Sequence, residues 1–190
     1  GSEMCIRDSN IGSLFSANNI SKYLKSQRID ISTTQVINYL KALCNAYLIN
    51  KIGRIDIKGL KKFEVGDKYF FEDLGLRNCH IGFNLQRDIH KLLENAVYLH
   101  LSLLQYEIYI GQNEQQEIDF IGIKQGKKVY VQVTYLVIDE KTREREFGNL
   151  MNIQDNYPKY VVSLDEFNKG SNVEGIHHLH LADFLKMKQL

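Results

Sequence analysis

The sequence predicts an α/β (α+β) protein with two parts, and the order of its hydrophobic patterns is the basis of that prediction. Residues 11–72 follow the order helix, helix, hairpin. From residue 84 the pattern becomes helix, three strands, helix and strand, which is typical of a mixed sheet flanked by helices. The chain has 190 residues, a length that fits one domain or two small ones.

The first part is predicted to contain two short helices followed by two alternating stretches. Ser16 is expected to cap the first helix. The second helix follows a Ser/Thr cluster and is expected to carry one apolar stripe made of Val36, Ile37, Leu40, Leu43, Cys44 and Tyr47. Apolar and polar residues alternate along residues 48–59 and 61–73, as they do in strands, and Gly59 and Gly66 mark turns. Two helices and a two-stranded wing is the winged-helix order, so residues 10–76 are predicted to form a winged-helix domain.

The second part, residues 84–190, is predicted to place three strands after a long amphipathic helix. The expected elements are a helix at 85–105, strands at 106–111, 117–123 and 128–136, a helix at 140–156, a strand at 159–164, and a short strand and helix within 175–187. Charges of both signs alternate along the helix at 140–156, which predicts that this helix presents a solvated face.

A hairpin is predicted between the second and third of these strands. Gln125-Gly126 suits a two-residue turn. Val129, Val131 and Val133 occupy alternate positions of the third strand, and side chains at alternate positions of a strand share one face. The three valines are therefore expected to face the core.

The register of this hairpin predicts a polar face. With the turn at Gln125-Gly126, Asp119 lies directly opposite Gln132, and Glu117 lies opposite Thr134. Directly opposed residues have Cβ atoms roughly 5 Å apart. The side chains expected on the other face of the second strand are Ile118 and Phe120.

Two interpretations of the polar face stay open. Such a face can simply be solvated. However, helices tend to cover both faces of a sheet in an α/β unit, and the helix that precedes the hairpin supplies Glu94. A helix carboxylate, a strand aspartate and a polar pair then form a specific constellation.

Several stretches carry a resemblance to a known family: GSLFSANNISKYLKSQ, INYLKALCNAYLI, RIDIKG, KYFFEDLGLRN, LENAVYLHL, EIDFIGI, YVQVTY and NIQDNYPKYVVSLD. Together they resemble the uncharacterised C-terminal domain of bacterial and archaeal AAA+ ATPases. This domain is similar to the PD-(D/E)xK nuclease superfamily. The resemblance implies a winged helix fused to a restriction-endonuclease-like αβββαβ domain. It also implies an upstream P-loop ATPase domain outside this chain, and ATP would bind only there.

The resemblance assigns the nuclease positions residue by residue. Glu94 takes the helix acid and Asp119 the strand aspartate, but Gln132 stands in place of the motif's Asp/Glu and Thr134 in place of its lysine. Mg²⁺, the implied metal, would be held by Glu94, Asp119 and Glu117. Losses of such charged groups commonly cost about 2–4 kcal/mol of transition-state stabilisation each, so cleavage is expected to be slow or absent. An active metal-dependent DNA endonuclease and a purely protein-docking module remain the alternatives.

Nucleic-acid contacts are predicted on the first part. The stretch NKIGRIDIKGLKK is basic and could follow phosphates if it forms the wing, while the second helix could enter a groove. The candidate residues are Thr33, Thr34, Gln35, Asn38 and Lys41 on the helix, and Arg54, Lys58, Lys61 and Lys62 in the basic stretch. A solvated basic hairpin that packs on a neighbouring domain explains the same stretch, and winged helices also serve as protein-docking modules.

Composition limits the class of protein. The formal net charge is +1, so any contact with DNA must come from a local patch. Three cysteines without a CxxC spacing favour a reducing, cytoplasmic location, and no apolar run is long enough to span a bilayer. Residues 1–9 are interpreted as a tag or assembly scar, so the natural protein is expected to begin further upstream.

Overall fold

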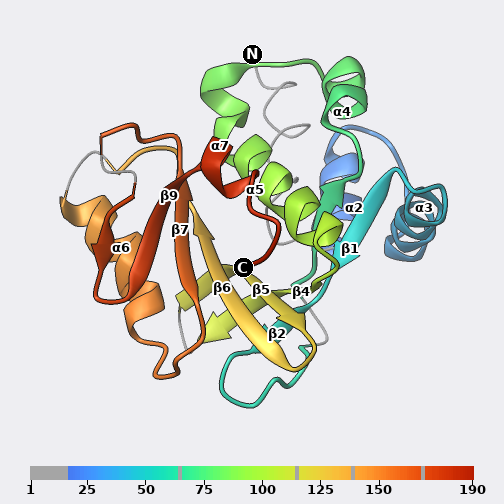
Figure 1. The fold of residues 1–190 in the computed structure, drawn as a ribbon. Helices are drawn as coiled ribbons and strands as arrows, with labels where there is room; N and C mark the ends of the chain where they lie inside the picture. Colours follow the sequence, from blue (N-terminus) through green and yellow to red (C-terminus); the bar gives the residue numbers. More distant parts are fainter. Residues whose placement is uncertain (1–16, 64–65, 114–115, 138–139, 168–169) are drawn as a thin grey trace.

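The computed structural model describes residues 17–63, 66–113, 116–137, 140–167 and 170–190 (Figure 1). Residues 1–9 and the predicted cap Ser16 lie outside this part of the chain. The elements are α2 (Ala17–Ser26), α3 (Thr33–Asn45), β1 (Ile49–Ile52), β2 (Arg54–Asp56), β3 (Lys68–Phe71), α4 (Leu74–Ile81), α5 (Leu85–Leu103), β4 (Glu107–Asn113), β5 (Gln116–Lys124), β6 (Lys127–Val133), α6 (Glu140–Met151), β7 (Lys159–Ser163), β8 (Asn172–Val173), β9 (Ile176–His180) and α7 (Leu181–Phe184). Groups of helices and groups of strands follow one another along the chain, so the predicted α/β (α+β) class is confirmed.

A seven-stranded mixed sheet organises the molecule, in the strand order β2-β4-β5-β6-β7-β9-β8. β4, β5 and β6 are antiparallel neighbours, whereas β7 runs parallel to both β6 and β9. α5 and α7 pack on one face of the sheet through Leu93, Val97 and Phe184. α6 packs on the other face through Phe147 and Leu150, which gives a helix–sheet–helix arrangement (Figure 1). The mixed sheet predicted for the second part is therefore confirmed.

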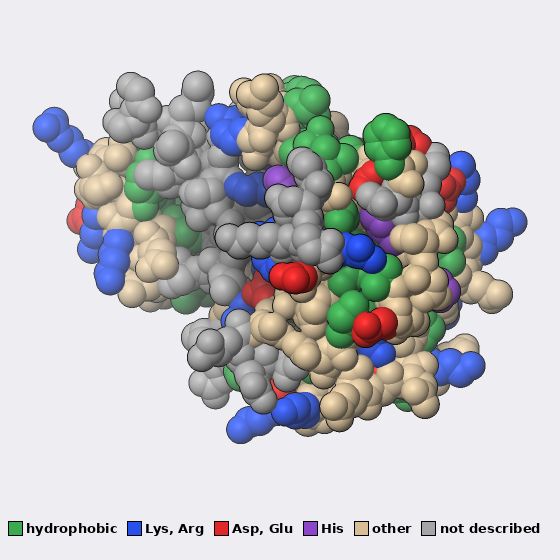
Figure 2. Space-filling model, turned by 90° about the vertical axis from the view of Figure 1, so that its left-hand side faces the viewer, with side chains coloured by type: hydrophobic (Ala, Val, Ile, Leu, Met, Phe, Trp, Pro, Cys, Tyr) green, Lys and Arg blue, Asp and Glu red, His purple; other side chains and the backbone are tan. Residues whose placement is uncertain are grey.

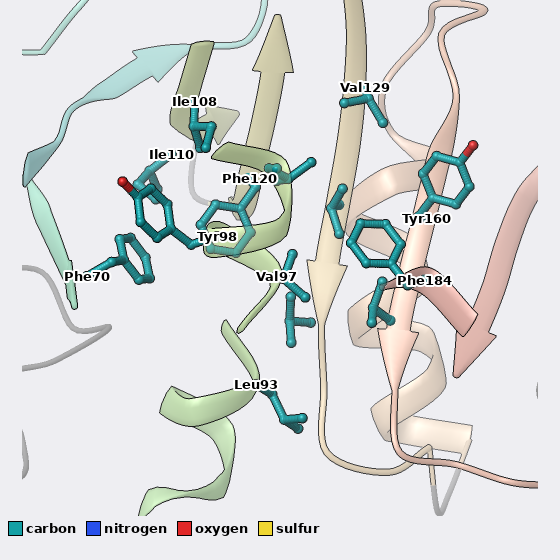
Figure 3. Close-up of a cluster of buried hydrophobic side chains, with 14 of the residues drawn as sticks. Phe70, Leu93, Val97, Tyr98, Ile108, Ile110, Phe120, Val129, Tyr160 and Phe184 are labelled. Atoms are coloured by element: carbon teal, nitrogen blue, oxygen red, sulfur yellow. The ribbon is translucent and has the colours of Figure 1, made fainter. Parts of the chain in front are cut away.

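The core beneath α5 also contains a residue from the first part of the chain. Phe70 of β3 is fully buried, and its ring lies 4.8 Å from that of Tyr98 on α5 and 5.3 Å from that of Phe120 on β5 (Figure 3). Asn95 of α5 secures the same strand, because its side chain accepts a hydrogen bond from the Phe71 amide and donates one to the Phe71 carbonyl, both at 2.8 Å. β3 is thus packed into the core of the second part.

The predicted wing is divided between two sheets. β1 pairs with β3 in a two-stranded sheet, but the chain turns at Gly53 and β2 joins the large sheet parallel to β4. The division follows burial, because Ile52 enters the core beneath α5 whereas Ile55 and Ile57 enter the core beneath α6. The predicted parts 10–76 and 84–190 therefore share one sheet and two cores.

α3 begins as the sequence predicts but leaves its apolar stripe largely uncovered. Ser32 caps the helix, and Ser32 and Gln35 form a reciprocal capping box. Within the described residues only Val36 of the predicted stripe is buried, while Ile37 is 39% exposed and Tyr47 is 79% exposed. The sequence therefore predicts the beginning of this helix, but its apolar pattern does not show how much of the stripe is covered.

Candidate functional site: a buried charge cluster

The predicted hairpin forms with its predicted turn. Gln125 and Gly126 have φ angles of 50° and 76°, which suit a tight two-residue hairpin turn. The ladder pairs Phe120 with Val131, and continuing it by one residue places Asp119 opposite Gln132. The three valines of β6 all lie in the core beneath α5, so that part of the pattern is confirmed.

A β-bulge changes the face pattern of β5. Tyr109 pairs with Ile121 and Gly111 pairs with Ile118, so one residue of β4 faces two residues of β5. As a result, Ile118 packs in the core beneath α6 whereas Phe120 packs in the core beneath α5. The prediction that these two side chains share a face is wrong, because simple alternation contains no extra residue. Asp119 is one of the two residues in the bulge.

The side chains of Asp119 and Gln132 satisfy backbone groups beside the bulge. The Val133 amide donates to Asp119 Oδ2 at 2.8 Å, and the Asp119 amide donates to Gln132 Oε1 at 3.3 Å. Both side chains are buried, at 8% and 7% exposure. Buried backbone groups need partners, so these contacts give both residues a structural role besides any chemical one.

Lys68 of β3 places its ammonium group among three carboxylates. Its Nζ lies 2.9 Å from Glu117 Oε1, 3.4 Å from Glu94 Oε2 and 3.7 Å from Asp119 Oδ1. The lysine side chain is only 4% exposed. Arg54 Nη2 lies 2.5 Å from Glu117 Oε2 and adds a second cation. The helix acid, both strand acids and two basic residues of the first part therefore meet in one cluster.

Burial and mutual repulsion shift the titration of this cluster. Burial, together with the Asp119 charge, raises the pKa of Glu94 to about 8 although Lys68 acts in the opposite direction. Burial also raises the pKa of Asp119 to about 6, against the lowering effect of Lys68. Burial alone would lower the pKa of Lys68, but the carboxylates of Asp119, Glu94 and Glu117 outweigh it and raise that pKa. Lys68 therefore stays charged, whereas Glu94 and Asp119 take up protons more readily than ordinary carboxyl groups.

Glu146 of α6 extends the cluster to the other face of the sheet. Gln132 Nε2 donates to Glu146 Oε2 at 3.0 Å, and Arg145 Nη2 lies 2.5 Å from Glu146 Oε1. Glu146 is 5% exposed, so the prediction that its helix presents a wholly solvated charged face is wrong at this position. Alternation of charge gave no sign of it. Its place four residues before Leu150, on the same face of the helix, was the available signal.

Thr134 does not take up its predicted pairing. β6 ends at Val133, and the Thr134 amide donates to the Val162 carbonyl of β7. Glu117 is paired with Gln112 of β4, on the other side of the bulge. The bulge shortens the β5–β6 ladder, and the predicted apposition of Glu117 and Thr134 is absent from the described pairing. Thr134 is nevertheless buried.

A Mg²⁺ ion does not fit the cluster as it is arranged. Carboxylate oxygens are the ligands that Mg²⁺ prefers, and Glu94, Glu117 and Asp119 supply them. However, their oxygens converge on the Lys68 ammonium. Across the residues that the structure describes, no three Asp, Glu, His or Cys side chains are grouped in a way that could hold a metal ion.

The predicted nucleic-acid residues fall on separate surfaces. Lys58, Lys61 and Lys62 are exposed on the loop between β2 and β3, at the lower end of the view in Figure 1, whereas α3 lies at the upper right. Arg54 is mostly buried against Glu117. On α3, Thr33 is half-buried, and the exposed candidates are Thr34, Gln35, Asn38 and Lys41. Figure 2 shows acidic and basic side chains interspersed on the face it presents.

Three comparisons describe what the chain is similar to. A family model described as "Domain of unknown function (DUF8612)" matches residues 5–87, and this match begins inside the segment interpreted as a scar. An uncharacterized protein of Haemophilus influenzae is 34% identical over 176 residues, which are 93% of this chain and 43% of that relative. The chain therefore spans less than half the length of this relative.

A solved structure is also similar, though too distantly to support an argument about fold. The crystal structure of protein VC1899 from Vibrio cholerae shares 13% identity with a TM-score of 0.27, and the match covers 90% of this chain and 47% of that one. These likenesses name no activity, so the resemblance to AAA+ ATPase C-terminal domains stays a prediction. No helix in the described ranges is long and apolar enough to cross a membrane.

Proposed function

We propose that this chain binds nucleic acid beside a degenerate nuclease-like site, as the C-terminal part of a bacterial AAA+ ATPase. The observation that carries the proposal is the Lys68 ammonium, which lies within 3.7 Å of oxygens from Glu94, Glu117 and Asp119. A tethered cation at this point offsets part of the negative charge of the acids without a metal ion. The proposal also includes a winged-helix domain in the first part of the chain, a nuclease-like domain in the second part and a cytoplasmic location.

The state of Gln132 supports a degenerate site. Its carbonyl oxygen accepts from the Asp119 amide, and its amide nitrogen donates to Glu146. Both ends of this side chain are therefore engaged, and a neutral amide contributes less to holding a divalent cation than a carboxylate would. A site in this condition favours binding over hydrolysis.

The basic loop between β2 and β3 supports nucleic-acid binding. Lys58, Lys61 and Lys62 are exposed on it, and such lysines attract phosphates. The strand before the loop carries Arg54 and the strand after it carries Lys68, so the loop starts and ends at the charge cluster. A nucleic-acid backbone that follows the loop would pass close to the acids.

A binding titration with charge reversals tests the proposal. The chain is titrated with fluorescent double-stranded and single-stranded DNA at two salt concentrations. Lys61→Glu/Lys62→Glu is expected to weaken binding and to reduce the slope of log K against log salt by about 2, or about one per lost phosphate contact. Lys186→Glu/Lys188→Glu, an exposed pair near the C-terminus, is the control and should change little. Binding that is absent, or insensitive to the loop reversal, overturns nucleic-acid binding and leaves protein docking.

An active metal-dependent endonuclease is the second candidate. The position of Lys68 beside the acids favours it, but a metal ion could reach the carboxylates only if the ammonium moved away from them. The motif position at Thr134 lacks a lysine, but β3 supplies an ammonium at the same acids. A cleavage assay on linear and branched DNA with Mg²⁺ or Mn²⁺ separates the two proposals. Metal-dependent cleavage that Asp119→Ala abolishes would establish the enzyme, whereas the degenerate site predicts no cleavage above background with either protein.

A further inference from the structure

The guanidinium group of Arg77 on α4 is buried against the first turn of α5. Arg77 is 1% exposed and is one of the largest side chains that are fully buried. Its Nη1 donates to Asn78 Oδ1 at 2.8 Å and lies 3.6 Å from Asp88 Oδ2. Among the residues that the structure describes, its Nε and Nη2 have no hydrogen-bond partner. A buried charged group with unpaired donors is costly, so this arrangement points to an acceptor from outside the described chain.

The two unpaired nitrogens of Arg77 form one edge of the guanidinium. The N–H of Nε and one N–H of Nη2 run parallel, and such a pair binds both oxygens of a single carboxylate or phosphate group. Arg54 differs, because only its Nε is unpaired and its Nη2 lies beside Glu117 Oε2. Arg77 therefore presents a complete edge for an oxyanion, whereas Arg54 does not.

Asp88 is held away from this edge because both of its oxygens have other partners. The Asn84 amide donates to Asp88 Oδ2 at 3.2 Å, and Arg87 Nε donates to Asp88 Oδ1 at 3.3 Å. Burial would raise the pKa of Asp88, but these hydrogen bonds and the charges of Arg77 and Arg87 outweigh it and lower that pKa. Asp88 is therefore ionised, and the two arginine charges around it exceed its own charge by one.

We propose that Arg77 binds a small carboxylate ion through Nε and Nη2. A planar ion with one negative charge matches both the parallel donors and the excess of one positive charge. A doubly charged phosphate would leave buried negative charge without a partner, which is costly. Because Arg77 is covered, the ion enters by a local opening and is then enclosed, which favours a small free acid over a side chain of a partner protein. The site shares no residue with the Lys68 cluster, so the proposal is independent of nucleic-acid binding.

NMR of the arginine Nε–H groups in the unaltered, ¹⁵N-labelled chain tests the site. The Arg77 resonance is assigned through its bonds to the backbone and followed during titration with sodium acetate at neutral pH. It is expected to shift progressively and to saturate, because the Nε–H gains an acceptor. Sodium chloride at the same ionic strength is the control and should not reproduce the shift.

An arginine-to-lysine substitution tests the role of the edge itself. Arg77→Lys keeps the positive charge but removes the parallel donors. Its affinity for acetate, measured from the rise of the thermal midpoint with acetate concentration, should be weaker by about tenfold or more. Arg28→Lys is the matched control, because Arg28 is exposed, and it should keep the acetate response of the wild type.

Four results would overturn the proposal. An Arg77 resonance that acetate does not shift would show that no carboxylate reaches the edge, and it decides the matter even where Arg77→Lys fails to fold. An equal shift with chloride would indicate a general effect of salt. A shift with inorganic phosphate but not with acetate would rule out a carboxylate as the ligand. A full acetate response in Arg77→Lys would place the binding of acetate elsewhere on the chain.

Discussion

Replacing Lys68 by methionine should destabilise the protein in a pH-dependent way. Methionine keeps most of the apolar stem of this buried residue but removes the ammonium. At an effective dielectric constant of about 20, a carboxylate 2.9 Å away contributes about 6 kcal/mol, and those at 3.4 and 3.7 Å about 4–5 kcal/mol each. The desolvation of the buried ions offsets most of this attraction. Breaking such a buried arrangement typically costs about 3–5 kcal/mol, which is the loss expected at pH 8.5.

The loss of unfolding free energy in Lys68→Met should be smaller at low pH, because the remaining carboxylates can take up protons. Glu94 and Asp119 already have pKa values raised to about 8 and about 6, and removing the cation raises them further. At pH 5 both are then neutral in the folded variant, and the loss is expected to fall to about 1–2 kcal/mol. The free energy of unfolding of the variant should therefore decrease as the pH rises from 5 to 8.5.

Urea unfolding followed by far-UV circular dichroism at pH 5 and pH 8.5 measures both values. The chain contains no tryptophan, so the usual fluorescence probe is absent. Lys51→Met is the matched control: it lies in the same two-stranded sheet and pairs with Asp67 at 2.8 Å, but its side chain is 53% exposed. It should cost under about 1 kcal/mol at either pH. Equal losses for Lys68→Met at the two pH values, or a loss as small as the control, would refute the reasoning.

Three further substitutions probe the same region. Glu94→Gln removes a group whose pKa rises from 4.5 to about 8 on folding. Between about pH 5 and pH 8 the free energy of unfolding of the wild type should therefore fall by about 1.4 kcal/mol per pH unit relative to that of the variant. Urea unfolding that gives parallel curves of stability against pH for the two proteins would contradict this. Gly122→Ala would bring a Cβ to 2.8 Å from Val129 Cγ1, so calorimetry should show a lower midpoint, equivalent to about 1–3 kcal/mol. Asn95→Ala leaves two Phe71 backbone groups without partners and should cost about 2–3 kcal/mol in urea unfolding, unless water replaces them.

The hairpin could be predicted from the sequence because its determinants are local. A two-residue turn and alternating valines fix the register of β5 and β6 as far as Asp119 and Gln132. The bulge could not be predicted in the same way. It depends on how β4 pairs with β5, and the local sequence around Asp119 and Phe120 does not specify that pairing.

The burial of the two basic residues in the cluster was not predicted, for a different reason. Lys68 and Arg54 lie in an alternating basic region, and a lysine there is usually solvated. Their burial follows from the split at Gly53, which sends β2 into the large sheet and holds β3 against α5. Contacts between segments so far apart in the sequence depend on tertiary packing, which local patterns do not encode. Glu94 was identified because it lies on the helix that precedes the hairpin, and the resemblance assigned it to the same site.

Gln132, which the resemblance places at a carboxylate position of the nuclease motif, is matched to its surroundings. Gln132 accepts from a backbone amide at the bulge and donates to Glu146, and a carboxylate at this position could not donate that second bond. A carboxylate there would instead face another buried carboxylate, which is costly. Lys68 likewise balances acids that would otherwise repel one another. These pairings favour a cluster that is stable as an internal ion network, and cleavage would require the network to open.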